Sequence, residues 1–305
     1  MCEPSTVALE DVLEAVPELR DAQSVGELSG GLTNTNYKVV TSEGSFVVRM
    51  AGRDTELLGI DRRNEAHNTA AAAETGVGAR VIATLPEHQA LVIEFIEGTR
   101  LHADDLRAGG RLPQVAEACR RLHGGRPFLL EFDMFDLQRR YLATVRERGF
   151  RLPDGYLELE PRIRTMEEAM RKRPERRVPC NNDLLAENFI DTGDELRLID
   201  YEYSGNNEPS FELGNSWSES NLQPAQLEEL VSCYYGLPLR NKVARARLWG
   251  VIAKYGWMLW ASIQEGVSTI EFDYWSWGLE KYERAVEELD GPEFERLLLD
   301  VQRTD

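Results

Sequence analysis

The sequence lacks any apolar run long enough to cross a membrane. A transmembrane helix needs about 20 consecutive, mostly apolar residues, and no segment of this 305-residue chain approaches that length. The opening residues, MCEPSTVALED, have neither a basic start nor an apolar core, so we expect no signal peptide. These absences predict a protein without membrane insertion, with the cytoplasm as its compartment.

Cysteine is scarce and scattered along the chain. The four cysteines, Cys2, Cys119, Cys180 and Cys233, show no C-x-x-C spacing, and no histidine completes a zinc-binding pattern with them. We therefore expect free thiols rather than a disulfide framework or a cysteine-based metal site.

Basic residues are few compared with acidic ones. The chain has 35 Lys and Arg against 53 Asp and Glu, a formal net charge of −18. A nucleic acid or an anionic membrane would be repelled by this charge, so neither is expected as a partner. A cationic substrate would be attracted, although an acidic balance also serves simply to keep a protein soluble.

The composition is otherwise that of a globular protein. Hydrophobic residues make up 42% and charged residues 29% of the chain, near the averages for soluble domains. A chain of this length can form two modest domains. We expect an α+β protein with a small lobe at residues 1–97 and a large lobe at residues 98–305.

The first 97 residues read as strands with two helices. Leu9, Val12, Leu13 and Val16 recur at helical spacing, and a second helix is expected at about residues 61–74. Short β-branched runs with turn residues between them predict antiparallel hairpins on either side of that second helix. These runs are VGEL, NYKVVT, SFVVRM, ARVIATL and ALVIEFI.

Beyond Gly98 the pattern changes to long amphipathic stretches such as PQVAEACRRLH, so we expect a mainly helical lobe. The exception is residues 178–200, where NFID and LRLID predict a small hairpin. A hairpin within a helical lobe suggests a functional role. We place a short hinge between the lobes near residues 94–98.

A glycine-rich turn is the first candidate for chemistry. In LSGGLTNTN, the segment with Ser29, Gly30, Gly31, Thr33 and Asn34 lies between two predicted strands. Glycines there would let backbone amides approach phosphate oxygens closely. The segment is not a G-x-G-x-x-G or Walker-type loop, and taken alone it is equally typical of an ordinary hairpin.

Arg49 and Glu65 are the second candidate. One lies near the end of a strand and the other in the following helix. Kinases use such a cation to hold nucleotide phosphates and such a carboxylate to hold the cation. Taken alone, the two residues are more typical of a solvated surface pair.

The third candidate is the segment CNNDLLAENFIDTGDELRLIDYEY. Asp183 is followed by Asn188 and, after the predicted hairpin, by Asp200. Phosphoryl transfer needs a carboxylate to orient or accept the proton of the attacking hydroxyl, and hard oxygen ligands for magnesium. The hairpin would bring residues that are distant in sequence to one metal ion.

This arrangement resembles the catalytic core of the choline/ethanolamine kinase family, within the aminoglycoside phosphotransferase superfamily. The likeness extends from about Leu28 to Tyr282 and includes SGGLTN, VVRMAG, IDRRNEA, LIDYEY, FELGNSWSE and LWASIQEGVSTIEFDYWSWGLEKYERA. The resemblance implies a bilobal protein-kinase-like fold, with a small antiparallel-sheet lobe that binds nucleotide and a large helical lobe that binds substrate. It also implies ATP and Mg²⁺ as cofactors.

The resemblance also assigns roles at the nucleotide end. Asp183 corresponds to the catalytic base, Asn188 and Asp200 to the magnesium ligands, and Arg49 with Glu65 to the phosphate-holding pair. Residues 94–96, with Glu94 and Ile96, correspond to the segment that contacts adenine. One departure stands out: Asn181 occupies the place of a family histidine that supports the catalytic loop.

The substrate end is expected to be aromatic and acidic. A quaternary ammonium group is recognised by aromatic faces, each contributing about 0.5–2 kcal/mol. Trp257 and Trp260 share one face of a predicted helix, where an aromatic stripe is also typical of a plain core. The resemblance implies that seven residues hold the ammonium group: Glu202, Tyr203, Glu219, Trp257, Trp260, Phe272 and Trp277.

The leading hypothesis is therefore a kinase that phosphorylates a small cationic alcohol, similar to choline or ethanolamine. Two alternatives stay open: a kinase for an aminoglycoside, another sugar or another amino alcohol, and a catalytically degenerate protein that binds nucleotide without turnover. Asn181 favours the degenerate reading, whereas the presence of Asp183, Asn188 and Asp200 disfavours it. The sequence is also compatible with a homodimer.

Overall fold

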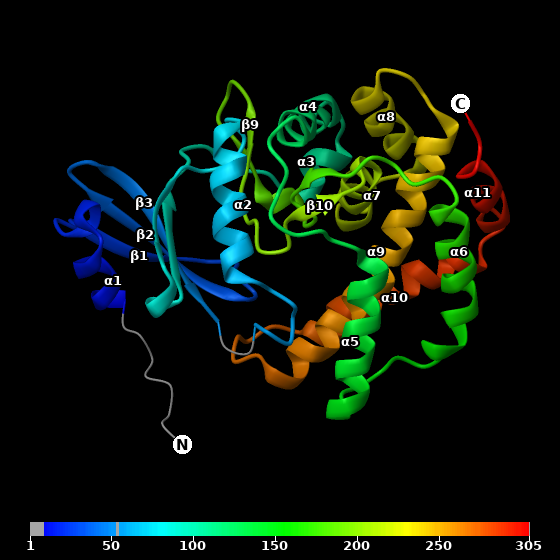
Figure 1. Cartoon of the computed structure of the whole chain (residues 1–305), viewed down its shortest axis with the longest axis horizontal. Helices are drawn as coiled ribbons and strands as arrows, with labels where there is room; N and C mark the ends of the chain where they lie inside the picture. The colour runs from blue at the N-terminus through cyan, green and yellow to red at the C-terminus, as the bar shows by residue number, and fades with distance from the viewer. Residues whose placement is uncertain (1–8, 53–54, 305) are drawn as a thin grey trace.

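The computed structural model describes residues 9–52 and 55–304. It has a small lobe built on a five-stranded antiparallel sheet and a larger lobe that is mainly helical, and the two lie side by side (Figure 1). The expected bilobal, protein-kinase-like α+β fold is confirmed.

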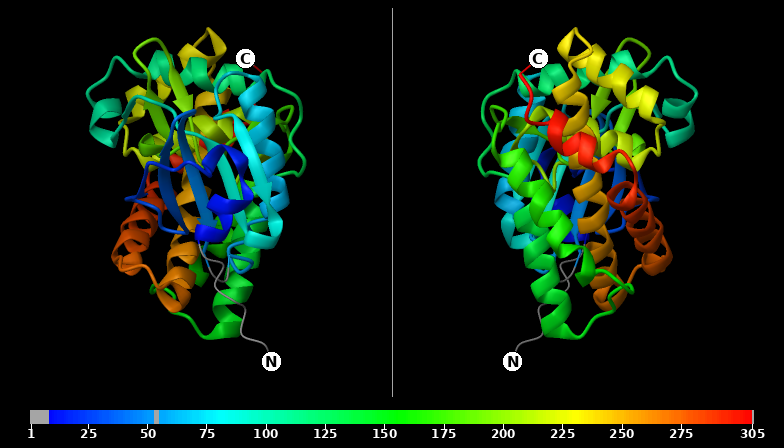
Figure 2. Two further views of the ribbon diagram at one scale, coloured as in Figure 1. Left: turned by 90° about the vertical axis from the view of Figure 1, so that its left-hand side faces the viewer. Right: turned by 90° about the vertical axis from the view of Figure 1, so that its right-hand side faces the viewer.

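The sheet of the small lobe has the order β1-β2-β3-β5-β4, with every neighbouring pair antiparallel. Phe46 and Val48 of β3 are two positions apart and so point to the same buried face of the sheet, where they meet Val12 of α1. Figure 2 shows α1 lying across the sheet. The elements are α1 Leu9–Ala15, β1 Ser24–Leu28, β2 Asn34–Thr41, β3 Gly44–Ala51, β4 Val81–Leu85 and β5 Ala90–Glu94.

Helix α2 (Arg62–Glu74) belongs to the small lobe and contacts the large one. It begins at Asp61, whose side chain accepts a hydrogen bond from the amide of Asn64 at 2.9 Å, as expected for a helix N-cap. The side-chain amides of Asn64 and Asn68 donate to the carbonyl oxygen of Ser204 at 2.7 and 3.2 Å. Polar contacts between the lobes therefore fix the helix that carries Glu65.

The large lobe is organised around α9 (Arg240–Val267), which is buried almost continuously from Ala244 to Gln264. Helices α5, α7 and α10 pack around it (Figure 1). No helix among the described residues is long and apolar enough to cross a membrane. The other helices are α3 Ala103–Arg107, α4 Leu112–His123, α5 Met134–Arg148, α6 Glu160–Arg171, α7 Pro209–Glu219, α8 Pro224–Tyr235, α10 Tyr274–Asp290 and α11 Phe294–Asp300.

The large lobe has more strands than the sequence indicated. The expected hairpin is present as β8 (Phe189–Asp191) and β9 (Leu196–Leu198), but β6 (Thr99–Arg100) adds a third strand to it. A second ribbon pairs β7 (Val178–Cys180) with β10 (Gly205–Asn207). Strands β6, β7 and β10 are short and pair with segments that are distant in the sequence, so no local turn indicates them as the turn at residues 192–194 indicates β8 and β9.

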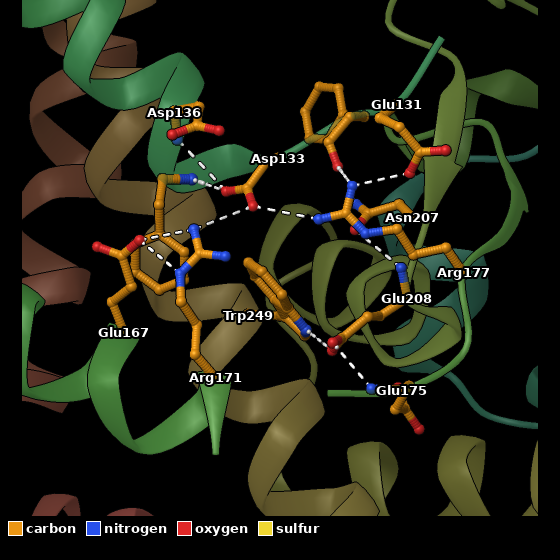
Figure 3. Close-up of polar contacts among 12 residues, drawn as sticks. Glu131, Asp133, Asp136, Glu167, Arg171, Glu175, Arg177, Asn207, Glu208 and Trp249 are labelled. Atoms are coloured by element: carbon orange, nitrogen blue, oxygen red, sulfur yellow. Dashed lines mark hydrogen bonds and ion pairs between the residues drawn. The ribbon is translucent and has the colours of Figure 1, made fainter. Parts of the chain in front are cut away.

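Charged contacts fasten α5 and α6 to the segment that enters β7 (Figure 3). One carboxylate oxygen of Asp133 accepts from the backbone amides of Phe135 and Asp136 and so caps α5. The other oxygen lies 3.2 Å from a guanidinium nitrogen of Arg171 and 3.3 Å from one of Arg177. One side chain therefore ties together three separate segments of the large lobe.

The cysteines agree with the expectation of free thiols wherever they are described. Cys119 and Cys180 are buried and Cys233 is half-buried, and none forms a disulfide. Burial raises the pKa of both Cys119 and Cys180 well above the ordinary value of a thiol. Cys2 lies outside the described residues.

Candidate active site

A cleft of about 550 Å³ lies between the lobes. Every site residue expected from the sequence lines it except Glu65, which lies behind Arg49. The lining residues expected from the sequence are Ser29, Gly30, Gly31, Thr33, Asn34, Arg49, Glu94, Ile96, Asp183, Asn188, Asp200, Glu202, Tyr203, Glu219, Trp257, Trp260, Phe272 and Trp277.

The glycine-rich turn between β1 and β2 closes one side of the cleft. Gly30 has a φ of +97°, a conformation that side chains rarely adopt. A Cβ added to Gly31 would overlap the carbonyl oxygen of Asn34. The two glycines thus have distinct steric reasons to be glycine, and together they give a turn whose backbone a ligand can approach closely.

Arg49 lies at the centre of a buried charge cluster. One guanidinium nitrogen is 2.6 Å from Glu65 and 2.8 Å from Asp200, which confirms the pair of Arg49 and Glu65. Burial alone would lower the pKa of Arg49, but Asp200, Glu65 and Glu202 together raise it above its ordinary value. The guanidinium is therefore a permanent cation facing the cleft, where it can bind phosphate oxygens.

An apolar slot lies beside the glycine-rich turn. Val47 and Ile93 approach it from the small lobe, and Ile190 and Ile199 approach it from the β8–β9 hairpin. The side chain of Glu94, which also lines the cleft, accepts a hydrogen bond from Arg197 at 3.2 Å. Two apolar walls contributed by different lobes suit a flat base. The sequence alone did not identify these four residues, because each is an ordinary strand residue.

The loop that carries Asp183 is held by Asn181, at the position where the resemblance led us to expect a histidine. The amide nitrogen of Asn181 donates to the carbonyl oxygens of Ile199 and Asp200 at 3.2 and 2.7 Å. The amide oxygen of Asn181 accepts from the backbone amide of Asp183 at 3.0 Å. Asn181 thus joins the segment of Asp183 to that of Asp200, which is the supporting role expected of the histidine.

Asn188 bonds to the segments that carry Asp183 and Asp200. Its side-chain nitrogen donates to the carbonyl oxygen of Asp183 at 2.8 Å, so its side-chain oxygen is left for another partner. Its own carbonyl oxygen accepts from the backbone amide of Ile199 at 2.9 Å. These bonds place Asp183, Asn188 and Asp200 around one part of the cleft, as the sequence predicted.

Asp183, Asn188 and Asp200 offer few ligands for a metal ion, but the ligands are of the type that magnesium prefers. Among the described residues, no cluster of three or more His, Cys, Asp or Glu could hold a metal ion by itself. Asn188 and Asp200 provide hard oxygen atoms, which suit Mg²⁺ when nucleotide phosphates and water complete its coordination. The residues therefore fit an ion that arrives with a nucleotide.

Burial and neighbouring carboxylates alter the acidity of the site. Burial, then Asp200, Glu219 and Glu202, raise the pKa of Asp183 well above that of an ordinary aspartate. Burial and Asp200 raise the pKa of Glu202 to about 7. An aspartate with raised proton affinity can accept a proton from an alcohol more readily than an exposed carboxylate can.

The other end of the cleft is walled by aromatic rings. The indole nitrogen of Trp260 donates to the hydroxyl of Tyr203 at 2.9 Å. The ring of Trp260 lies 5.3 Å from that of Trp277, and the rings of Tyr203 and Trp257 lie 5.1 Å apart. Phe272 stands at the rim with 41% of its surface exposed. The two helical tryptophans belong to the core and also line the cleft, so the core and ligand interpretations of the aromatic stripe both apply.

The two carboxylates at this end differ in their partners. Glu202 accepts from the side-chain amide of Asn34 at 2.8 Å and lies 3.5 Å from Arg62, so it is already engaged by the small lobe. Glu219 pairs with Lys281 of α10. The sequence did not identify Arg62 or Lys281, because a single cation on an amphipathic helix has no distinguishing pattern.

The comparisons with known proteins agree on one family. The choline/ethanolamine kinase family model matches residues 25–229. Ethanolamine kinase 2 of Mus musculus is 27% identical over 256 residues, which cover 75% of this chain and 66% of that protein. The chain thus spans just under two thirds of the length of that relative.

Two solved structures are similar over almost their whole length. A choline/ethanolamine kinase family protein from Mesorhizobium loti superposes with a TM-score of 0.84 at 29% identity, covering 96% of this chain and 97% of that one. The choline kinase LicA from Streptococcus pneumoniae superposes with a TM-score of 0.78 at 26% identity, covering 92% of this chain and 98% of that one.

Proposed function

Because the chain belongs to the choline/ethanolamine kinase family, we propose that it transfers the γ-phosphate of ATP to the hydroxyl of a small cationic amino alcohol such as choline or ethanolamine. One observation carries the proposal. A single cleft is lined at one part by Asp183, Asn188 and Asp200 and at another by Trp257 with other aromatic rings. A phosphoryl donor and an ammonium-bearing acceptor would therefore share one space.

The nucleotide would occupy the side of the cleft formed by the small lobe. Its base fits the apolar slot of Val47 and Ile93, and its phosphates would lie against the backbone of the glycine-rich turn. Arg49 would bind the phosphates while Glu65, 2.6 Å away, holds its guanidinium in place. Arg49 would then exchange its contact with Asp200 for one with phosphate, and Asp200 would become free for a metal ion.

Asn188 and Asp200 would hold the magnesium ion that accompanies the nucleotide. When bound, such an ion neutralises charge on the transferring phosphate. The hydrogen bond from Asn188 to the carbonyl oxygen of Asp183 keeps this pair close to the proposed base.

Asp183 would orient the acceptor hydroxyl and take its proton. The acceptor ammonium would lie against the rings of Trp257 and Trp260, near Glu219, with its hydroxyl directed at Asp183. Positioning and charge neutralisation would supply most of the rate, because phosphoryl transfer asks little covalent chemistry of the protein.

An ADP-release assay tests the proposal. It compares choline, ethanolamine, other amino alcohols and aminoglycosides, with and without Mg²⁺. We expect turnover only when ATP, Mg²⁺ and a small amino alcohol are all present. If no acceptor raises the rate of ADP release above the rate measured without acceptor, the proposal fails and the degenerate-protein alternative is favoured. Preferential turnover of aminoglycosides would instead favour the polycation alternative.

A further inference from the structure

Glu219 is a buried carboxylate with one strong partner. It is the last residue of α7, lines the cleft and has a side chain that is 2% exposed. One of its oxygens, Oε2, pairs with Nζ of Lys281, whose side chain is 12% exposed. The other, Oε1, has no hydrogen-bond partner in the part of the chain that the structure describes. A buried carboxylate depends strongly on the single cation it contacts.

Lys281 also contacts the aromatic wall. Its Nζ lies 4.2 Å from the centroid of the Trp277 ring, one turn earlier on α10, in the range of a cation–π interaction. Trp277 in turn packs against Trp260. Lys281 therefore touches both a carboxylate and a ring that line the cleft, while it does not line the cleft itself. One face of Trp277 is already occupied by a cation that belongs to the protein.

No other cation takes this role among the described residues. Lys254 of α9 is buried, but its Nζ lies over the ring of Trp217 at 3.9 Å and forms no ion pair. Arg49 and Arg62 contact Glu65, Asp200 and Glu202 instead. Among the described residues, Lys281 is thus the only cation that forms an ion pair with Glu219, and Lys254 acts on this carboxylate from a longer distance.

We propose that Lys281 is a specificity-determining positioning residue of the acceptor site: it fixes Glu219 and offsets its charge, so that the site favours an acceptor with one positive charge over one with two. This inference rests on the proposed function. A lysine next to the ammonium site is a like charge, and a like charge disfavours every additional cation that an acceptor brings. The chemical class selected is a small monocationic alcohol.

The first test replaces Lys281 with Gln, whose amide can still donate to Glu219. We expect the KM for ethanolamine to rise about tenfold, because an amide holds Glu219 in position less firmly than an ion pair does, while the KM for ATP changes by less than about twofold. K281R should restore the KM for ethanolamine to within about threefold of the parent. The matched control is R284M, which removes a more exposed cation from the same helix and should leave both values unchanged.

The second test measures selectivity directly. The parent should use ethanolamine with a kcat/KM at least about tenfold above that for the dication 1,3-diamino-2-propanol, and K281Q should reduce this ratio about tenfold. A loss of packing alone would weaken both acceptors equally. An unchanged ratio in K281Q would overturn the proposal.

The third test uses the sign of a charge effect. E219Q leaves Lys281 without its carboxylate, so the lysine should repel the acceptor. The double variant E219Q/K281Q removes that repulsion and should bind ethanolamine more tightly than E219Q does. If the two changes instead add as independent losses, Lys281 does not act through Glu219.

The outcomes separate this inference from the proposed function. If the parent phosphorylates no amino alcohol, the proposed function fails. If the parent is active but K281Q keeps both its KM and its selectivity, only the inference fails. Thermal unfolding of each variant shows whether it is folded. Should K281Q not fold, E219Q/K281M takes the place of E219Q/K281Q, since methionine fills the space of the lysine without a charge and should again bind ethanolamine more tightly than E219Q does.

Discussion

The two ends of α7 differ in whether their buried polar groups have hydrogen-bond partners. Glu208, just before the helix, accepts from Arg245 at 2.7 Å, from the indole of Trp249 at 2.9 Å and from the backbone amide of Glu175 at 3.0 Å. The contacts with Trp249 and Glu175 are drawn in Figure 3. At the other end, five buried groups lack hydrogen-bond partners within the described residues. They are the hydroxyls of Ser216, Ser218 and Ser220, the indole nitrogen of Trp217 and Oε1 of Glu219.

This difference separates a scaffold from a site. Burying a polar group without a partner costs about 1–3 kcal/mol, so a fully partnered end is the stable arrangement. An end with unused donors and acceptors costs stability but leaves capacity for water or a ligand. Glu208 contacts Trp249 of the large-lobe core, whereas Glu219 at the other end of α7 reaches the cleft.

Backbone contact holds the two ends on one rigid unit. A Cβ added to Gly214 of α7 would overlap the carbonyl oxygen of Ala246 in α9, and one added to Gly250 would overlap the ring of Trp217. The two glycines thus allow the helices to cross in close contact. This close packing fixes the position of α7, so the unpartnered polar groups at its cleft end are held in place.

Removing the proposed base should produce the largest effect, and it should be confined to the cleft. Asp183→Ala is expected to lower kcat by about 10²–10⁴-fold, because the variant loses the carboxylate that we propose takes the proton. Since Asp183 lines the cleft beside other carboxylates, its loss should not lower the free energy of unfolding. Single-turnover kinetics and thermal unfolding check the two halves, with ATP binding as the control. A variant with parental turnover would remove Asp183 from the mechanism.

Breaking the scaffold end should have the reverse result. Arg245→Met leaves Glu208 buried without its cation and should lower the free energy of unfolding by about 3–5 kcal/mol, while the folded fraction keeps its KM values. The control is Arg247→Met, which removes a less buried pair with Glu288 and should cost at most about 1 kcal/mol. Urea unfolding measures both. Equal effects at the two positions would show that the scaffold end holds no special stability.

The glycine-rich turn sharpens the same contrast within the small lobe. Gly31→Ala forces a Cβ into the carbonyl oxygen of Asn34 and should raise the KM for ATP by an amount equivalent to about 1–3 kcal/mol. Gly26→Ala is the matched control in the adjoining strand, since nothing lies within 4 Å of a Cβ there. Initial-rate measurements at varied ATP distinguish the two. If Gly31→Ala binds ATP as the parent does, the turn does not contact phosphate.

Local patterns predicted much of this molecule. The hairpins of the small lobe, α2 and the β8–β9 hairpin follow from side-chain periodicity and turn residues over a few positions. The group of Asp183, Asn188 and Asp200 lies within one continuous segment, and the residues bonded to it confirm that the three lie together.

The features that the sequence did not predict depend on contacts between distant segments. Strands β6, β7 and β10 have two or three residues each, and their pairing joins positions far apart in the chain. Lys281 and Glu219 are separated by 62 positions, and neither has a pattern that indicates the other. Partners of this kind are fixed by helix packing, which a single sequence does not reveal.

The aromatic wall should give the smallest and most selective effect. Trp257→Phe keeps an aromatic face and Trp257→Leu removes it, and both leave an apolar side chain at a position that is 4% exposed. We expect the leucine variant to raise the KM for choline more than the phenylalanine variant does, by a factor that corresponds to about 0.5–2 kcal/mol of binding free energy. A site that relied on carboxylates alone would not distinguish the two. Since both variants shrink the same side chain, their difference in choline KM, corrected by the KM for ATP, isolates the ring from its packing. Equal KM values would assign Trp257 to the core and leave recognition of the ammonium to Glu219.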